Sequence, residues 1–377
     1  MIASGCALLL RSFVNLLQVE TGFRGHGVVA MQVFAWDRHP EPAQRRAYFE
    51  QVDAAVAALP GVEATGAVSA MPFIEANIDV RAIFQISGRP KSAPGDEPRA
   101  SVNVATPGYF ETLRIPLRRG RHLNSRDGST APSVAVISDV LAARYWRDTD
   151  PIGSRIAFRY GGQQVDAEIV GVVGAIRHER LDETPRAEIV LPHAQAPTGS
   201  MTIVARSRLD GAPLIESVKA AIWGIDPRQS FYRTAAVDEL VTRTLVTRRF
   251  ALFVLTGFAA TALLLAAAGL YGVLNAIAAQ HRREIGVRLA LGARWIDIVR
   301  LVAARGLAVA GVGVVVGLAG ALGGSRLLSE FLFEVGPADP VSIAGAAAAI
   351  LFVSGLASYI PARRAASADP AEVLRAE

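Results

Sequence analysis

The chain has 377 residues, of which 51% are hydrophobic and 19% are charged. This composition is too apolar for intrinsic disorder, and the single cysteine, Cys6, excludes a disulfide scaffold and any multi-cysteine zinc or iron–sulfur site. The formal net charge is +5, yet residues 24–240 hold 25 basic and 25 acidic residues, so the excess lies outside that block. A nucleic-acid-binding domain should carry its own basic face, so the distribution argues against a nucleic-acid partner and favours orientation in a membrane.

The amino-terminal segment, residues 1–23, is apolar over its first ten residues. Ten residues extend only about 15 Å as a helix, half of what a bilayer core requires. Arg11 follows this apolar stretch, whereas a signal peptide carries its positive charge in front. Because a block of more than 200 residues behind it needs export, we interpret residues 1–23 as the end of a truncated transmembrane helix.

Residues 24–240 alternate strand-like and helix-like patterns and predict a mixed α+β domain, richest in strands from roughly residue 115 to 195. Strands are expected at 28–34, 62–68, 83–86, 100–105, 133–137, 155–158, 165–173, 188–191 and 202–206. Helices are expected at 41–59, 107–113, 139–146, 212–225 and 237–249. The last of these runs directly into an apolar stretch, so it is suited to carry rigid motion between the domain and a membrane.

Three stretches contain no Asp, Glu, Lys or Arg: residues 250–280, 306–325 and 340–362, with 31, 20 and 23 residues. About 20 helical residues cross a bilayer core, so the sequence predicts three complete transmembrane helices. The loop 281–305 carries six arginines against two acidic residues, while the loop 326–339 carries one arginine against three acidic residues. The positive-inside rule therefore places loop 281–305 and the C-terminus in the cytoplasm and residues 24–240 outside.

No motif for catalysis or cofactor binding is found in the sequence. The only lysines, Lys91 and Lys219, are not part of the Gly-Lys-Ser/Thr element of a nucleotide-binding loop. The six histidines, at positions 26, 39, 122, 178, 193 and 281, lack metal-ligand spacing, and we expect them to be solvated on the surface. We therefore predict no catalytic, cofactor-binding or metal residues, no cofactor and no enzymatic activity, and uncharged spans argue against proton-coupled transport.

A ladder of small residues runs along the second apolar stretch: Gly313, Gly317, Gly320 and Gly324. Spacings of three or four place these glycines along one side of a helix, where another helix can approach closely. The partner is either another helix of this chain or a second copy in a dimer, and the sequence leaves both open.

The arginine-rich loop reads HRREIGVRLALGARWIDIVR over residues 281–300. Ile285, Leu289, Ile296 and Val299 recur on one helical face, and Glu284 and Arg288 form an i,i+4 pair in the favourable order. The pattern predicts a short amphipathic helix at the inner membrane surface. It is either an anchor on anionic lipid or a docking helix for a cytoplasmic partner.

Within that loop, residues 283–293 (REIGVRLALGA) resemble the hallmark of the FtsX-like, or MacB-like, permease family. Two further matches flank the loop, AAAGLYGV at 266–273 and SYIPARRAASADPAEVLRAE at 358–377. Three others resemble the MacB-like periplasmic core domain: TPGYFETLRIPLRRGRHL at 106–123, ISDVLAARYW at 137–146 and IVGVVGAIRHERLDE at 169–183. The resemblance is closest to the carboxyl half of large duplicated permeases of the acidobacterial type.

The resemblance implies a truncated helix end (1–23), a MacB-like periplasmic core domain (24–240) and an FtsX-like permease domain with three transmembrane helices (241–377). It implies a multi-pass protein of the bacterial inner membrane that serves as the permease subunit of an ABC-type export or mechanotransmission system. The expected partners are a cytoplasmic ABC ATPase, a second permease copy or half, and membrane lipid. The ATPase-coupling residues would be Arg283, Glu284, Ile285, Gly286, Arg288, Leu289, Ala290, Leu291, Gly292 and Ala293.

Two alternatives remain open. One is a non-transporting FtsX-like regulator that relays the state of an ATPase to an extracytoplasmic enzyme. The other is a non-functional fragment of a larger duplicated permease.

Overall fold

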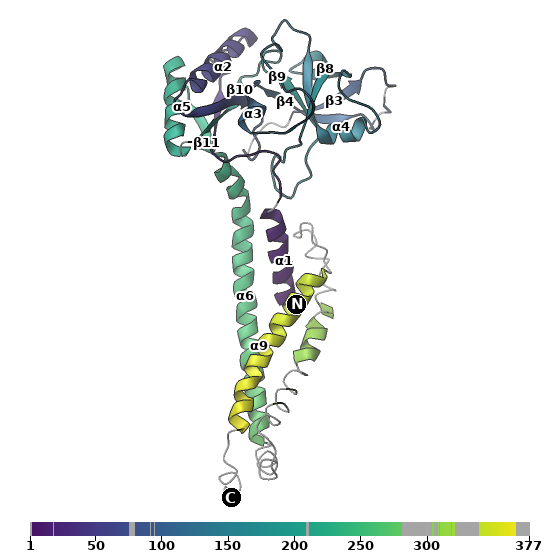
Figure 1. The fold of residues 1–377 in the computed structure, drawn as a ribbon, viewed down its shortest axis with the longest axis vertical. Coiled ribbons are helices and arrows are strands. Elements are labelled where there is room, and N and C mark those ends of the chain that lie inside the picture. Colours follow the sequence, from purple (N-terminus) through teal and green to yellow (C-terminus); the bar gives the residue numbers. More distant parts are fainter. Residues whose placement is uncertain are drawn as a thin grey trace, which may run out of the picture. The chain divides into compact units, whose positions relative to one another are not determined.

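The computed structural model describes residues 2–17, 19–74, 80–90, 92–93, 95–208, 211–280 and 339–366, together with residues 300, 304, 308, 310–317 and 319–320. The chain divides into two compact units: Glu20–Leu245, which we call the head, and Met1–Val19 with Val246–Glu377, which we call the helical unit. The domain boundaries given above, at 23/24 and 240/241, remain a prediction. Figure 1 shows the labelled elements of both units.

The head combines strands and helices as the alternating patterns predict. Its strands are β1 (Val28–Phe34), β2 (Val62–Val68), β3 (Arg81–Ile86), β4 (Arg99–Ala105), β5 (Leu117–Gly120), β6 (Val134–Ser138), β7 (Arg155–Tyr160), β8 (Gln163–Val173), β9 (Glu188–Pro192), β10 (Ser200–Ser207) and β11 (Phe231–Ala236). Its helices are α2 (Pro42–Ala57), α3 (Tyr109–Thr112), α4 (Asp139–Tyr145) and α5 (Gly211–Ile225), and α6 (Val237–Gln280) begins in it.

The sequence patterns missed two strands, β5 and β11. All four residues of β5 are exposed, so that strand shows no alternation of apolar and polar residues. The pairing of β11 with β1 shifts register part-way along, which breaks the period-two pattern there. Neither strand therefore leaves a periodic signal in the sequence.

Six strands of the head close into a ring. The pairs β4–β3, β3–β7, β7–β8, β8–β6, β6–β9 and β9–β4 return to the starting strand. Large side chains such as Phe84, Ile137, Leu141, Ile156 and Ile169 fill its core. Since β3 and β4 belong to this ring, the strand-rich region begins near residue 81, earlier than the predicted residue 115.

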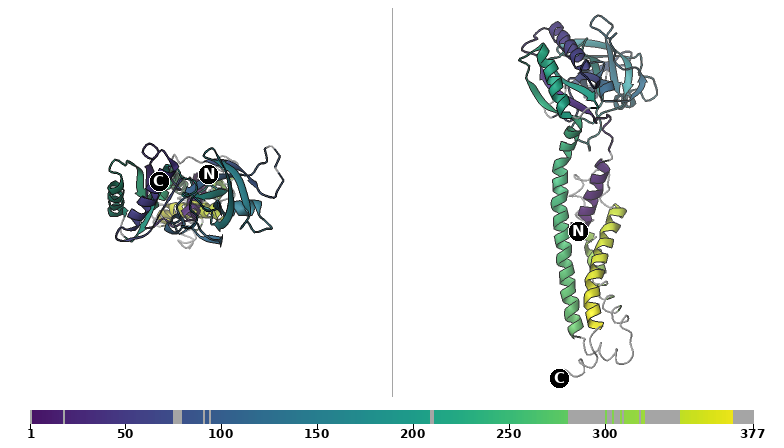
Figure 2. Two further views of the ribbon diagram at one scale, coloured as in Figure 1. Left: turned by 90° about the horizontal axis from the view of Figure 1, so that it is seen from above. Right: turned by 60° about the vertical axis from the view of Figure 1, so that its left-hand side comes forward.

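A second layer consists of β11, β1, β10 and β2 in that order, with α2 and α5 packed on it. These two helices lie next to each other in Figures 1 and 2. Phe49 and Val52 of α2 and Ile222 of α5 pack with Met31 and Ile203 in a separate apolar core. Between layer and ring, β2 and β4 pair through Val68 and Ala105. The head thus contains two hydrophobic cores joined by a short ladder.

The helical unit contains α1 (Ile2–Leu17), the later part of α6 and α9 (Pro340–Ala366). Helices α1 and α9 lie side by side in Figures 1 and 2, and Arg11 Nη1 lies 2.5 Å from Asp339 Oδ2. On α6, Phe250, Phe253 and Phe258 are 69%, 79% and 63% exposed. Exposure of large apolar side chains on this scale is unfavourable in water, and a hydrocarbon environment removes that cost.

Among the described residues, one helix segment, Val237–Ile277, is long and apolar enough to cross a membrane. A second apolar segment, Ala344–Tyr359 of α9, is shorter. Much of the middle stretch, 306–325, lies outside the described residues. Three complete transmembrane helices therefore remain a prediction.

Candidate functional site

The loop predicted to couple to an ATPase, Arg283 to Ala293, lies outside the described residues, as does Gly324 of the glycine ladder. Gly313, Gly317 and Gly320 are helical. A Cβ atom added to Gly313 would meet no described atom within 4 Å outside its own helix. The described helices therefore leave this side of Gly313 open to a further helix.

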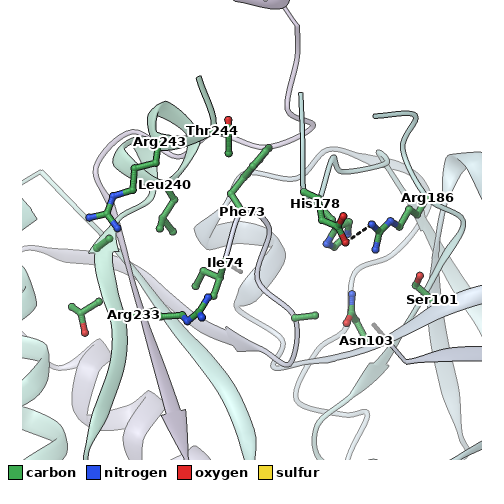
Figure 3. A pocket seen from close by; sticks show the side chains of 14 residues that line it. Phe73, Ile74, Ser101, Asn103, His178, Arg186, Arg233, Leu240, Arg243 and Thr244 are labelled. Atoms are coloured by element: carbon green, nitrogen blue, oxygen red, sulfur yellow. Dashed lines mark ion pairs between the residues drawn. The ribbon is translucent and has the colours of Figure 1, made fainter. Parts of the chain in front are cut away.

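The head contains a cavity of about 560 Å³ that no sequence motif indicated. Two groups of side chains face each other across it (Figure 3). Arg233, Leu240 and Arg243 form one wall, which we call the arginine wall, and His178 and Arg186 lie on the opposite wall with Asn103 and Ser101. Phe73 and Ile74 lie between the walls. The cavity is thus apolar in the middle and polar on both sides.

One residue of the arginine wall, Arg233, is positioned by a bulge in β11, whereas Leu240 and Arg243 lie on α6. Ala30 pairs with Ala235 and Gln32 with Tyr232, so one residue of β1 faces two of β11, Arg233 and Thr234. Arg233 takes a positive φ of 45° at this point. An inserted residue bends a strand and re-aims its side chains, and here Arg233 lines the cavity. Regular alternation along β11 would not predict this placement.

Two residues of the opposite wall, Asn103 and His178, contact a buried glutamate that does not itself line the cavity. Glu188, at the start of β9, is 6% exposed and accepts a hydrogen bond from Asn103 Nδ2. His178 Nε2 lies 3.3 Å from its other carboxylate oxygen. Ser69 Oγ in turn donates to Asn103 Oδ1 at 3.3 Å. The pKa of Tyr109 is raised well above its ordinary value, mainly by burial and to a smaller extent by the negative charge of Glu188.

Arg186, also on this wall, is balanced by acidic neighbours. Its guanidinium lies 2.6 Å from Glu179 Oε1, the ion pair drawn in Figure 3, and 3.0 Å from Glu183 Oε1. The charge of Arg186 is therefore compensated by two carboxylates of its own loop. Within the described residues, no group of three or more His, Cys, Asp or Glu is placed to hold a metal ion.

A second polar cluster joins the segment that enters the head to the helix that leaves it. The buried Arg206 donates to the backbone carbonyls of Arg24, His26 and Thr112, at 2.5, 2.7 and 2.7 Å. His26 Nδ1 lies 3.1 Å from Asp238 Oδ2 in the first turn of α6. The charge-assisted hydrogen bonds to Arg24 and His26 fix the entering backbone against β10, and the bond to Thr112 ties the end of α3 to the same guanidinium.

The expectation that the histidines are solvated on the surface is wrong for His193, which is 3% exposed, and for His178, whose side chain is 11% exposed. His193 packs edge-on against Phe49 and its Nε2 lies 3.1 Å from the Thr198 carbonyl oxygen. Burial lowers the pKa of His193 to about 4, against the opposing hydrogen bond to Thr198. Since a neutral imidazole with one partner is tolerated in a core, no metal is needed to explain its burial.

His193 makes the stability of the head pH-dependent. Its folded-state pKa of about 4 lies below the ordinary 6.5, so the unfolded chain binds the proton more readily. The free energy of unfolding therefore keeps its full value above about pH 6.5 and falls as the pH is lowered toward about 4. Between pH 7.5 and pH 5 the loss due to His193 is about 2 kcal/mol. Pulse proteolysis in urea on the full chain measures the change. His193→Gln should flatten it, and an equal pH slope in both proteins would contradict the assignment.

Two family models match the chain. The MacB-like periplasmic core domain matches residues 2–222, and the FtsX-like permease C-terminal domain matches residues 256–370. The chain belongs to the MacB/FtsX-like family of ABC transporter permeases. The head is therefore a MacB-like periplasmic core domain with an α+β fold.

Relatives of this MacB-like chain include exporters. The macrolide export ATP-binding/permease protein MacB of Rhodospirillum rubrum is 26% identical over 84% of this chain and 51% of its own length. The pyoverdine export ATP-binding/permease protein PvdT of Pseudomonas savastanoi pv. phaseolicola is 29% identical over 70% of this chain and 40% of its own length. This chain spans about half the length of the curated relatives it matches or less.

The crystal structure of the periplasmic region of MacB from Actinobacillus actinomycetemcomitans matches 60% of this chain and 95% of that chain, with 12% identity and a TM-score of 0.40. The extracellular domain of the noncanonic ABC-type transporter YknZ matches 54% of this chain and 100% of that chain, with 14% identity and a TM-score of 0.35.

Proposed function

We propose that the chain is the membrane permease subunit of an ABC-type export system that couples a separate cytoplasmic ATPase to the periplasmic head. The observation that carries the proposal is helix α6. It begins at Val237, next to β11 in the head, and continues without a break to Gln280. The family's hallmark loop at 283–293 begins three residues later. One continuous element thus connects the core domain to the segment expected to contact the ATPase.

The proposed mechanism couples binding of the ATPase to an equilibrium between two conformations of the permease. A partner that binds one membrane conformation more tightly than another shifts the equilibrium between them by its differential affinity. ATP-driven closure of the ATPase would bias the loop helix, and α6 would carry that bias to the head. A helix of 44 residues rises about 66 Å, more than twice the hydrocarbon thickness, so the same helix can cross the membrane and reach into the head.

The proposed topology has three transmembrane helices, at 250–280, 306–325 and 340–362. It places residues 24–240 in the periplasm and the loop 281–305 and the C-terminus in the cytoplasm. The Arg11–Asp339 contact supports it, because Arg11 precedes the head in sequence and Asp339 ends the acidic loop assigned to the same side. The exposed phenylalanines of α6 support a lipid-facing surface.

Cysteine labelling tests this topology. In a Cys6→Ser background, Asp148→Cys places a thiol at an exposed position of the head, and Ser367→Cys places one in the tail. With a membrane-impermeant maleimide on intact spheroplasts, Asp148→Cys should react fully and Ser367→Cys only after permeabilisation. Labelling of both in intact spheroplasts would overturn the assignment.

The proposed partners are the cytoplasmic ATPase, membrane lipid and a second permease copy. The open side of Gly313 supports a contact with a second copy, since no described helix of this chain covers it. The exporter names of the relatives favour transport over regulation of an extracytoplasmic enzyme. A deletion strain distinguishes the two: loss of transport raises sensitivity to exported compounds, whereas loss of regulation changes the activity of an envelope enzyme.

A further inference from the structure

The cavity between the arginine wall and the opposite wall, which carries His178 and Arg186, has the features of a ligand site. Its volume of about 560 Å³ falls within the range of small-molecule sites, about 300–1,000 Å³. Five apolar side chains with 4–7% exposure contribute to its lining: Ala70, Phe73, Ile74, Ala235 and Leu240. Such a surface suits the apolar body of an organic molecule rather than a free inorganic ion.

Backbone strain is concentrated at the same place. Among the described residues, three that are not glycine have positive φ, and two of them, Phe73 at 61° and Arg233 at 45°, line this cavity. For a bulky aromatic residue this conformation is a true outlier, with a cost on the order of 1–3 kcal/mol. Phe73 is held there by its N–H, which donates to the His178 carbonyl at 2.6 Å. Strained residues of this kind cluster at ligand sites.

The charges on the two walls differ. Among the described residues that line the cavity, Glu179 is the one acidic residue, and it pairs with Arg186. The arginine wall carries Arg233 and Arg243. Arg243 also pairs with Glu239 at 2.8 Å, but both side chains are more than half exposed, and such a surface pair contributes little energy. A ligand anion can therefore exchange with Glu239 at small cost.

We propose that this cavity binds an amphipathic organic anion, with its apolar body on Phe73, Ile74 and Leu240 and its acidic group against Arg233 and Arg243. The site needs only the folded head, so the inference does not rest on transport or on an ATPase. Two kinds of ligand meet this description: a single-chain carboxylate, and an anionic lipid with a phosphate headgroup. Both carry an acidic group on an apolar chain.

Equilibrium dialysis with radiolabelled decanoate tests the proposal on the full chain in phosphatidylcholine nanodiscs, with binding to empty nanodiscs subtracted. Decanoate should bind saturably at one site per chain, and decanol, which has the same apolar body without the charge, about tenfold more weakly or worse. Competition by dihexanoylphosphatidylglycerol assigns the site to a lipid headgroup. If other single-chain carboxylates compete and the lipid does not, the site is assigned to single-chain anions.

Variants connect the binding to the arginine wall. Arg233→Asn removes the charge but keeps a residue that tolerates positive φ, and Arg243→Gln removes the charge at an exposed helix position. Together they should weaken decanoate binding by about tenfold or more, and Arg243→Gln alone by less. Arg147→Gln, at an exposed position away from the cavity, is the matched control and should bind like wild type.

A thermal unfolding curve for each variant shows whether the head is folded. If Arg233→Asn unfolds the head, the single Arg243→Gln variant carries the test. Equal affinity for decanoate and decanol would overturn the proposal. So would unchanged decanoate affinity in the folded double variant or, where Arg233→Asn unfolds the head, in the folded Arg243→Gln protein.

Discussion

Glu284→Lys is expected to abolish stimulation of the partner ATPase by the permease while leaving the protein in the membrane. The loop is predicted to form an amphipathic helix in which Glu284 and Arg288 pair at i,i+4. A lysine at 284 replaces that attraction with repulsion and reverses the charge of the docking surface. Gly286→Pro should act in the same direction, because proline within a helix removes a hydrogen bond and clashes with the preceding turn.

The measurement is the ATPase rate of the complex purified through a tag on the full chain, together with the amount of ABC ATPase that co-purifies. Glu330→Lys is the matched control, since it makes the same charge change in the loop 326–339 that we assign to the opposite side of the membrane. That variant should retain stimulation. If Glu284→Lys and Gly286→Pro both stimulate like wild type, this loop is not the docking element.

Gly108→Ala is expected to destabilise the head by about 3 kcal/mol or more, because it inserts a methyl group into a backbone-to-backbone contact. A Cβ at Gly108 would lie 2.0 Å from the Thr65 carbonyl oxygen, and one at Gly66 would lie 2.4 Å from the Tyr109 nitrogen. The φ of Gly108 is −74°, which any residue adopts, so the cost comes from close approach and not from backbone strain. Neither contact partner is the flexible end of a side chain.

Pulse proteolysis across a urea series on the full chain measures this loss as a lower unfolding midpoint. Gly128→Ala is the matched control, because a Cβ there meets nothing within 4 Å and φ is not positive. This variant should leave the unfolding midpoint unchanged or raise it slightly, because alanine lowers the conformational entropy of the unfolded chain relative to glycine. A Gly108→Ala midpoint equal to that of Gly128→Ala would show that α3 shifts away from β2 without cost.

Local periodicity predicted most elements of the head because each depends on near neighbours in sequence. The strands at 28–34 and 62–68 appear with the predicted bounds, and α2 and α5 lie within a few residues of theirs. The same reasoning failed at β5, which is exposed throughout, and at β11, where the bulge at Arg233 interrupts the pattern. It also placed His193 on the surface, since a histidine flanked by Pro192 and Ala194 carries no signal of burial.

The cavity could not have been read from the sequence. Its lining comes from residues 70–74, 101–103, 178–186 and 233–244, segments that become neighbours only when the ring closes and β11 pairs with β1. Asn103 and Glu188 meet because β4 and β9 pair in parallel although 85 positions separate the two residues. No local pattern encodes which distant strands will pair.

By itself, the sequence determined the family, through the motifs in the loop and the core domain, and the long uncharged stretch 250–280 that becomes the later part of α6. Both are properties of contiguous residues: a charge-free run of 31 residues favours a membrane through its own transfer free energy. The tertiary structure alone decided the closure of the ring, the burial of Glu188 and His193, and the direction of Arg233. These features depend on which segments pack together, and packing is a joint property of residues far apart in the chain.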